Sequence, residues 1–171
     1  NIQTGKTVRY RIIQDDAVSN IYMQAYRPSQ RMDPDVSKFP EALPGVIGMN
    51  VKKVLVLFAG CGKDMIIFDA LAGGNVDVTG VELNPLVKRI CETNPLLAQF
   101  RWNDFYKRNN MHHVIAEGRN YLEQHENEKY DVVYIAASGA ASASLKQASS
   151  RKYLETEEAY RQYESHLQPG G

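Results

Sequence analysis

Residues 54–64 limit most strongly what this chain can fold into. The stretch begins with an apolar run at 54–58, which is typical of a strand that is buried on both faces. The run breaks at Gly60-Cys61-Gly62, and the helical pattern that follows stops at Gly73-Gly74. A strand, a glycine turn and a helix form the first half of a nucleotide-binding βαβ unit, in which glycines let a ligand approach the backbone.

The alternation of strands and helices continues along the chain. Further buried strands are predicted at 76–82, 112–116 and 130–136, and further helices at 38–47, 85–91, 118–124 and 155–167. Asn84 is the expected cap of the helix at 85–91, with Pro85 at its first position. Alternating strands at 7–14 and 21–25 predict a hairpin ahead of them. Strands that alternate with helices imply a parallel sheet with right-handed crossovers. The predicted fold is therefore α/β, a Rossmann-like doubly wound parallel sheet with a small N-terminal β-hairpin.

The domain boundaries follow from this pattern. We assign residues 1–34 to the hairpin and an irregular segment, and residues 35–171 to the Rossmann-like domain. No strand follows the last predicted helix before the terminal Pro-Gly-Gly, which would leave the fourth strand as an exposed apolar edge. We therefore expect the sheet to be truncated, because the chain is a fragment of a longer protein or because a partner completes it.

Composition argues against several classes of partner. The 20 Lys and Arg residues balance 20 Asp and Glu residues, whereas a nucleic-acid-binding protein usually carries a basic face. No run of 18 apolar residues is present, so we expect no direct membrane contact by this chain. Two scattered cysteines, Cys61 and Cys91, favour a reducing compartment over a disulfide framework. We expect a cytoplasmic location, either for a separate protein or for the cytosolic domain of a larger one.

A carboxylate lies at the end of the second predicted strand, where a ribose would bind. Glu82 lies 22 residues after Gly60, and in a parallel sheet both positions face the same crevice. The carboxylate could accept hydrogen bonds from both ribose hydroxyls, although a solvated acid at a strand end is the alternative. The glycine turn in register favours nucleoside binding.

Two residues of the helix after the glycine turn indicate which nucleoside the site would bind. The dinucleotide fingerprint has Gly or Ala where this chain has Met65. Asp64, in the first helical turn, would repel a pyrophosphate, and Lys63 offsets this only in part. A ligand with an ammonium group and no phosphate fits better, and S-adenosylmethionine is such a ligand. Glu117, after the third strand, could then accept from an adenine amino group, or could simply lie at a helix N-terminus.

Several stretches together resemble the successive motifs of class I S-adenosylmethionine-dependent methyltransferases, and within them the spermidine synthase-like branch. These stretches are residues 39–44, 54–64, 81–85, 117–122, 129–133, 153–160 and 167–171. The resemblance implies a cofactor, S-adenosylmethionine or its decarboxylated form, that is held without a metal. It also implies that the full-length protein could carry membrane segments, because members of this branch are often fused to them. The residues that would bind it are Gly60, Cys61, Gly62, Asp64, Glu82, Leu83, Glu117 and Gly118.

The sequence differs from that branch at positions that matter for the reaction. Spermidine synthases carry acids where this chain has Cys61, Ala136 and Gly139, and deprotonating an amine near neutral pH needs a positioned base. We therefore expect no spermidine synthesis, and we interpret Cys61 as a small loop residue. The leading hypothesis is a methyltransferase that acts on an unknown small molecule, with no catalytic residue assigned. The alternatives are an aminopropyltransferase of polyamine chemistry with atypical acids, and a non-catalytic nucleoside-binding or interaction domain; the resemblance also leaves a homodimer open.

Other candidate sites are weaker. His112 and His113 would point to opposite faces of a strand, so they do not form a metal pair. Tyr153 could line a substrate pocket, whereas Tyr160 and Tyr163 are expected in the core because of their helical spacing.

Overall fold

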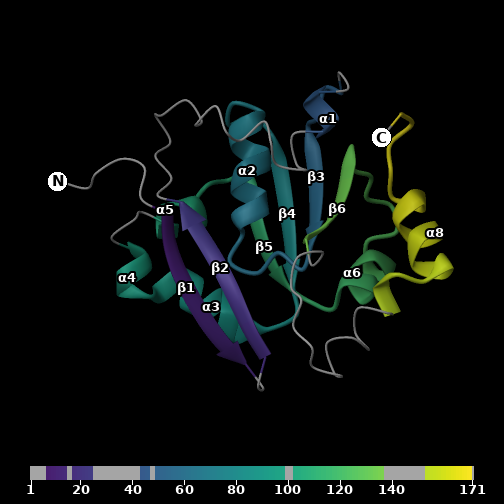
Figure 1. The fold of residues 1–171 in the computed structure, drawn as a ribbon. Coiled ribbons are helices and arrows are strands. Elements are labelled where there is room, and N and C mark those ends of the chain that lie inside the picture. The colour runs from purple at the N-terminus through teal and green to yellow at the C-terminus, as the bar shows by residue number, and fades with distance from the viewer. Residues whose placement is uncertain are drawn as a thin grey trace.

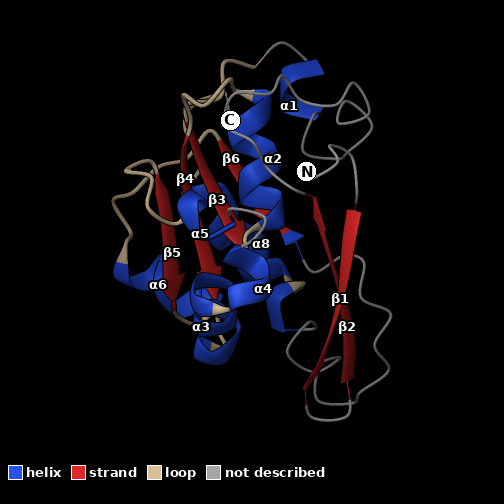
Figure 2. Ribbon diagram, turned by 90° about the vertical axis from the view of Figure 1, so that its left-hand side faces the viewer, coloured by secondary structure: helices blue, strands red, loops and turns tan. Residues whose placement is uncertain are grey.

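The computed structural model describes residues 7–14, 17–24, 43–46, 49–98, 102–136 and 153–170. In this part of the chain a four-stranded parallel sheet lies between helices on both of its faces (Figure 1). Two further strands form a separate antiparallel sheet (Figure 2). The predicted fold class is confirmed.

The strand of the large sheet that comes first in sequence lies in its interior, and later strands lie on both sides of it. Its strands are β3 (Lys53–Leu57), β4 (Asp77–Glu82), β5 (Met111–Ile115) and β6 (Val132–Ile135). Their order in the sheet is β5-β4-β3-β6, and every neighbouring pair is parallel. The chain therefore moves outward from β3 to β5 and then returns to the other side of β3. In such sheets ligands bind outside the carboxyl ends of the strands, beside the point of reversal.

Helices bury both faces of β3, as the apolar run predicts. Residues 54–57 of this strand have no exposed surface. One face is covered by α2 (Lys63–Leu71), α3 (Pro85–Thr93) and α5 (Trp102–Phe105), and the other by α6 (Gly118–Gln124) and α8 (Glu157–Ser165) (Figure 1). Val54 and Val56 pack into the first core, whereas Leu55 and Leu57 pack into the second. This alternation is the two-residue period of a strand.

The ends of the helices follow the predicted signals. The side chain of Asn84 accepts a hydrogen bond of 2.9 Å from the Leu86 N–H, and Pro85 is the first helical residue of α3. Gly73 and Gly74 end α2 with φ of 65° and 84°, in the left-handed region that favours glycine. The first signal sets where the connection from β4 to α3 ends, and the second sets where the connection from α2 to β4 begins.

The N-terminal part differs in detail from its prediction. The hairpin consists of β1 (Thr7–Gln14) and β2 (Ala17–Gln24), so the return strand begins earlier than expected. Within the predicted helix at 38–47, residues 43–46 form α1 (Leu43–Val46), which contains Pro44 in its first turn; residues 38–42 and 47 lie outside the described residues. The short helix α4 (Pro95–Ala98) follows α3.

A buried ion pair ties the end of α2 to the segment before β5. Asp69 has no exposed surface, and the guanidinium of Arg108 donates to both of its carboxylate oxygens. The amide of Asn110 donates to Asp69 Oδ1 at 3.2 Å and to the Val76 carbonyl at 2.6 Å. The network satisfies a carboxylate that would otherwise be costly to bury.

The two cysteines form a disulfide, contrary to the prediction. Cys61 and Cys91 are 30 residues apart in sequence, but their Cα atoms lie 5.5 Å apart because the glycine turn packs beside α3. The interpretation of Cys61 as a plain loop residue is therefore wrong, and the cysteine count no longer supports a reducing compartment. Separately, none of the helices in the described ranges has the length and apolar character needed to cross a membrane.

Candidate nucleoside site

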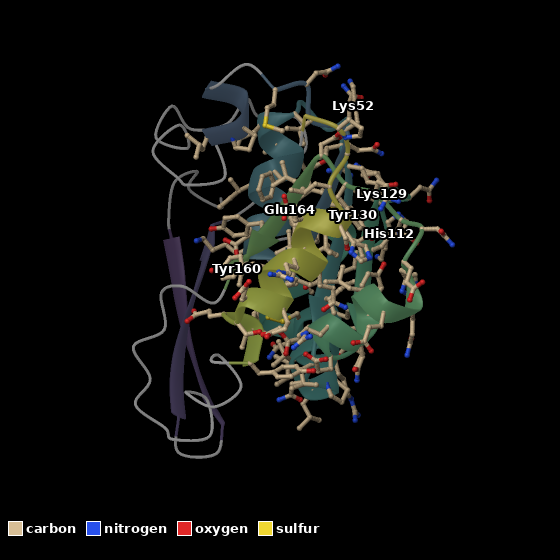
Figure 3. All side chains as sticks on the ribbon, turned by 90° about the vertical axis from the view of Figure 1, so that its right-hand side faces the viewer. Lys52, His112, Lys129, Tyr130, Tyr160 and Glu164 are labelled. Carbon is tan, nitrogen blue, oxygen red and sulfur yellow. A yellow bond between two sulfur atoms is a disulfide. The ribbon has the colours of Figure 1, made fainter. Side chains whose placement is uncertain are left out.

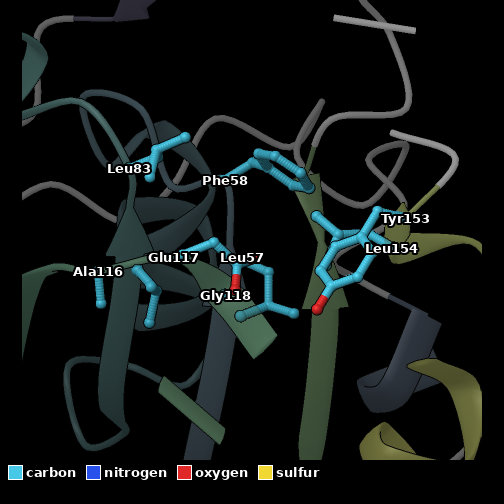
Figure 4. Close-up of a pocket in the computed structure, with 9 residues that line it drawn as sticks. Leu57, Phe58, Leu83, Ala116, Glu117, Gly118, Tyr153 and Leu154 are labelled. Carbon is cyan, nitrogen blue, oxygen red and sulfur yellow. The ribbon is translucent and has the colours of Figure 1, made fainter. Parts of the chain in front are cut away.

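A cavity of about 330 Å³ opens where β3, β4 and β5 end. Figure 4 shows the side chains around it. Its lining is mostly apolar, and it consists of Leu57, Phe58, Val81, Leu83, Ala116, Glu117, Gly118, Tyr153 and Leu154. Both its place at the carboxyl ends of the strands and its size, near the lower end of the range of about 300–1,000 Å³, suit a small ligand.

The glycine turn lies beside this cavity. Gly60 and Gly62 have φ of 54° and 76°, which glycine adopts without strain. The Ala59 N–H donates to the Val81 carbonyl at 3.0 Å, so the turn is tied to the end of β4. A Cβ on Gly62 would come within 3.1 Å of the Phe105 ring. Packing beneath the turn, as well as its backbone conformation, therefore requires glycine there.

Glu82 meets the glycine turn, as the sequence predicts. Its Oε2 accepts a hydrogen bond of 2.9 Å from the Gly60 N–H, and its Oε1 accepts one of 2.8 Å from the Asn84 N–H. A carboxylate offers about four acceptor positions, so about two remain for the hydroxyls of a ligand. The carboxylate is thus fixed in position by the two backbone groups and still able to bind.

Glu117 plays the structural part that the sequence left as the alternative. Its oxygens accept from the Arg119 and Asn120 N–H groups at 3.2 and 2.9 Å, which makes it the cap of α6. It also lines the cavity. Capping does not exhaust its acceptor positions, so a contact with a ligand amino group is compatible with this geometry.

The predicted cofactor residues fall into two groups. Leu83, Glu117 and Gly118 line the cavity. The others are not among its lining residues, and they are Gly60, Cys61, Gly62, Asp64 and Glu82. Asp64 has a side chain that is 14% exposed, and one of its oxygens lies 3.5 Å from the Lys63 ammonium. Ligand contacts for all of these residues stay predictions.

Phe58 is a site residue that the sequence analysis missed. It lines the cavity with φ of 58°, the only non-glycine residue of the described ranges with a positive φ. This conformation is a genuine outlier for a bulky side chain. The signal in the sequence is an aromatic residue at the point where the chain turns out of its strand.

The three tyrosines do not share one environment. Tyr153 lines the cavity, and Tyr163 is buried as predicted, where burial raises the pKa of its hydroxyl to about 12. The core prediction is wrong for Tyr160, which is 55% exposed on α8 (Figure 3). The buried stripe of this helix runs through Ala159 and Tyr163, and Tyr160 lies at its edge.

A pair of stacked rings is hydrogen-bonded to the glycine turn. His113 stacks on Tyr106 with ring centroids 5.3 Å apart, and the Tyr106 hydroxyl donates to the Cys61 carbonyl at 2.7 Å. Burial, helped by the nearby Lys88 ammonium and opposed by the Gly60 backbone, lowers the pKa of His113 to about 4. His113 is therefore neutral at pH 7, and it faces the opposite side of β5 from the exposed His112, as expected.

No protein-family model matches the sequence, and neither does any curated protein. Solved structures match over most of the chain. A spermidine synthase in complex with the transition-state analogue AdoDATO aligns with a TM-score of 0.55 and 19% identity, over 98% of this chain and 54% of that one. Human methyltransferase-like protein 13 in complex with SAH aligns with a TM-score of 0.54 and 16% identity, over 82% of this chain and 63% of that one. An O-methyltransferase from Bacillus cereus in complex with SAH aligns with a TM-score of 0.51 and 19% identity, over 83% of this chain and 56% of that one.

These similarities define the fold. The chain has the fold of class I S-adenosylmethionine-dependent methyltransferases, which spermidine synthases share. It spans about half the length of the solved structures that it matches.

Proposed function

We propose that this chain binds S-adenosylmethionine and serves as a methyltransferase on an unknown small molecule. The observation that carries the proposal is the 2.9 Å hydrogen bond between the Gly60 N–H and Glu82. It brings a carboxylate and an open backbone turn together beside an apolar cavity. A nucleoside fits this arrangement with its base in the cavity and its ribose on Glu82, which leaves the amino-acid part toward the glycine turn.

The charges around the turn support a ligand without phosphate. Glu82 and Asp64 are both acids, and Asp64 lies in the first turn of α2, where a pyrophosphate would otherwise bind. The ammonium group of S-adenosylmethionine carries the complementary charge. When bound, this cofactor would supply a methyl group on a sulfonium, and its transfer can depend mainly on proximity and orientation.

Aminopropyl transfer is the second candidate, because spermidine synthases share the fold. The disulfide weighs against it. Cys61 takes the place of a loop acid and its sulfur is bonded to Cys91, so it can neither bind a cationic amine nor accept its proton. Ala136 also lacks an acid, and Gly139 lies outside the described residues. A non-catalytic domain that keeps the nucleoside site remains the third hypothesis.

Calorimetric titration with S-adenosylmethionine, its decarboxylated form and NAD tests these candidates. We expect binding of the carboxylated form and none of NAD. Preference for the decarboxylated form would instead support aminopropyl transfer, and binding of NAD alone would overturn the proposal. Binding without any methyl transfer to a broad set of acceptors would favour the non-catalytic domain.

Glu82 provides the residue-level test. Glu82→Ala should weaken binding by roughly ten- to a hundredfold, because a hydrogen bond to a charged group contributes about 1.5–3 kcal/mol. Glu82→Gln keeps one acceptor oxygen and should lose less, and the exposed Glu123→Ala on α6 should bind as the unmodified chain does. Unchanged affinity in both Glu82 variants would remove this carboxylate from the site.

A further inference from the structure

Two exposed apolar side chains flank the cavity. Leu83 is 57% exposed and Tyr153 is 47% exposed, and both line it. Figure 4 shows them on opposite sides, with Leu57 between them. Apolar groups that are exposed around a concave site gain most when a ligand covers them. A flat aromatic group lying between Leu83 and Tyr153 would cover both.

Tyr153 is held in place although its ring is half exposed. The next residue, Leu154, is 4% exposed and packs with Leu57 in the core. The buried hydroxyl of Tyr163 donates a hydrogen bond of 2.9 Å to the Leu154 carbonyl. The backbone that carries Tyr153 is therefore anchored to α8.

The ring itself is positioned by a neighbouring cation. The guanidinium carbon of Arg119 lies 4.4 Å from the centroid of the Tyr153 ring, within the range of a cation–π contact. Arg119 is fixed in turn by Gln162 of α8, since its Nε donates to the amide oxygen at 3.0 Å and its carbonyl accepts from the amide nitrogen at 3.2 Å. A ring with one face covered in this way loses little freedom when a ligand packs against the rest of it.

We propose that Tyr153 contacts the purine base of the nucleoside and that Arg119 and Gln162 are positioning residues for its ring. The inference rests on the proposed function, because it assigns a base to the cavity beside Glu82. It adds a wall that comes from the segment before α8, far in sequence from the glycine turn.

The test compares two ligands that differ only in the base. S-adenosylhomocysteine carries adenine, and S-ribosylhomocysteine keeps the ribose and the amino acid without it. Tyr153→Ala should weaken the affinity for S-adenosylhomocysteine by about tenfold, since stacking of a base on an aromatic ring contributes on that scale. Its affinity for S-ribosylhomocysteine should not change. Tyr153→Phe should bind both ligands normally, and Tyr153→Leu replaces the alanine variant if that one does not fold.

Arg119 is tested by the same pair of ligands. Arg119→Met should lower the affinity for S-adenosylhomocysteine by about threefold, as expected for loss of a cation–π contact that orients the ring, and Arg119→Lys should recover part of it. A purely structural role would weaken both ligands equally. Tyr160→Ala is the matched control, because Tyr160 is an exposed tyrosine of α8 outside the cavity lining.

The outcomes separate the two proposals. If the unmodified chain binds S-adenosylhomocysteine and Tyr153→Ala and Tyr153→Leu bind it equally well, the role of Tyr153 is overturned and nucleoside binding stands. Equal losses for both ligands in the Tyr153 variants also overturn that role. If the unmodified chain binds neither ligand, the proposed function fails and this inference fails with it.

Discussion

Phe58 shows how a single residue can be kept in an unfavourable conformation at a cavity. Its φ of 58° lies in the left-handed region, which costs an L-residue about 1–2 kcal/mol. Strain of this kind persists where the surroundings hold it, and it concentrates at ligand sites. The Phe58 ring lines the cavity proposed to hold the base. This contact explains why position 58 carries a side chain, although glycine would adopt the same backbone conformation without strain.

Comparing two small substitutions at this position isolates the strain. Phe58→Gly and Phe58→Ala both remove the ring, but only glycine relieves the backbone, so the glycine variant should be more stable by about 1 kcal/mol in urea denaturation. At Leu83, where φ is not positive, the order should reverse by a similar amount, because glycine has the greater conformational entropy when unfolded. An alanine variant at position 58 as stable as the glycine variant would contradict the strain.

Residue-level signals explain which parts of the site were predictable. Asn84, Pro85 and Glu82 follow local rules about caps and strand ends, so their neighbours in sequence identify them. The Cys61–Cys91 pairing depends on packing between distant segments, which no local spacing encodes, and the sequence offered Tyr153 only as one candidate pocket residue.

At the scale of elements, the ion pair between Asp69 and Arg108 joins α2 to the segment before β5. Arg108→Met should destabilise the fold by about 3–5 kcal/mol, because it leaves a buried carboxylate without its charged partner. Lys107→Met is a suitable control, since Lys107 has a side chain that is 75% exposed and pairs only at the surface with Asp104. Chemical denaturation measures both, and a loss below about 1 kcal/mol for Arg108→Met would show that the pair contributes little.

Periodicity accounts for the elements that the sequence predicted well. β3, β4 and α6 lie within a residue or two of their predicted bounds, because each shows a clear alternation or a clear start and stop. The four-residue helices α4 and α5 show no clear helical period in the sequence, because a single turn is too short for one.

For the whole molecule, the disulfide is the covalent link between the glycine turn and α3. Closing a loop across a sequence separation of 30 should stabilise the fold by roughly 3.5 kcal/mol, mainly by restricting the unfolded chain. The double variant Cys61→Ala, Cys91→Ala should therefore unfold at lower urea concentration than the oxidised chain. A reducing agent should destabilise the unmodified chain and leave the double variant unchanged; no effect on either would mean that the thiols are not bonded in solution.

The overall topology was predictable, whereas the complete site was not. Alternating strands and helices fix a parallel sheet with right-handed crossovers, and the β5-β4-β3-β6 order follows the expected reversal. The site needs in addition the segment at Tyr153 to lie over the ends of strands that come much earlier in the sequence. Such an arrangement depends on how α8 packs against α6, which pattern alone does not specify.

The cavity collects side chains from three strand ends and from the segment before α8. It consequently exists only while the strands and the segment before α8 are assembled. By mass action, any compound that binds there must raise the melting temperature, with a gain that grows with its concentration. Heating curves recorded against a library of small molecules would therefore identify occupants of the cavity without any assumption about the reaction.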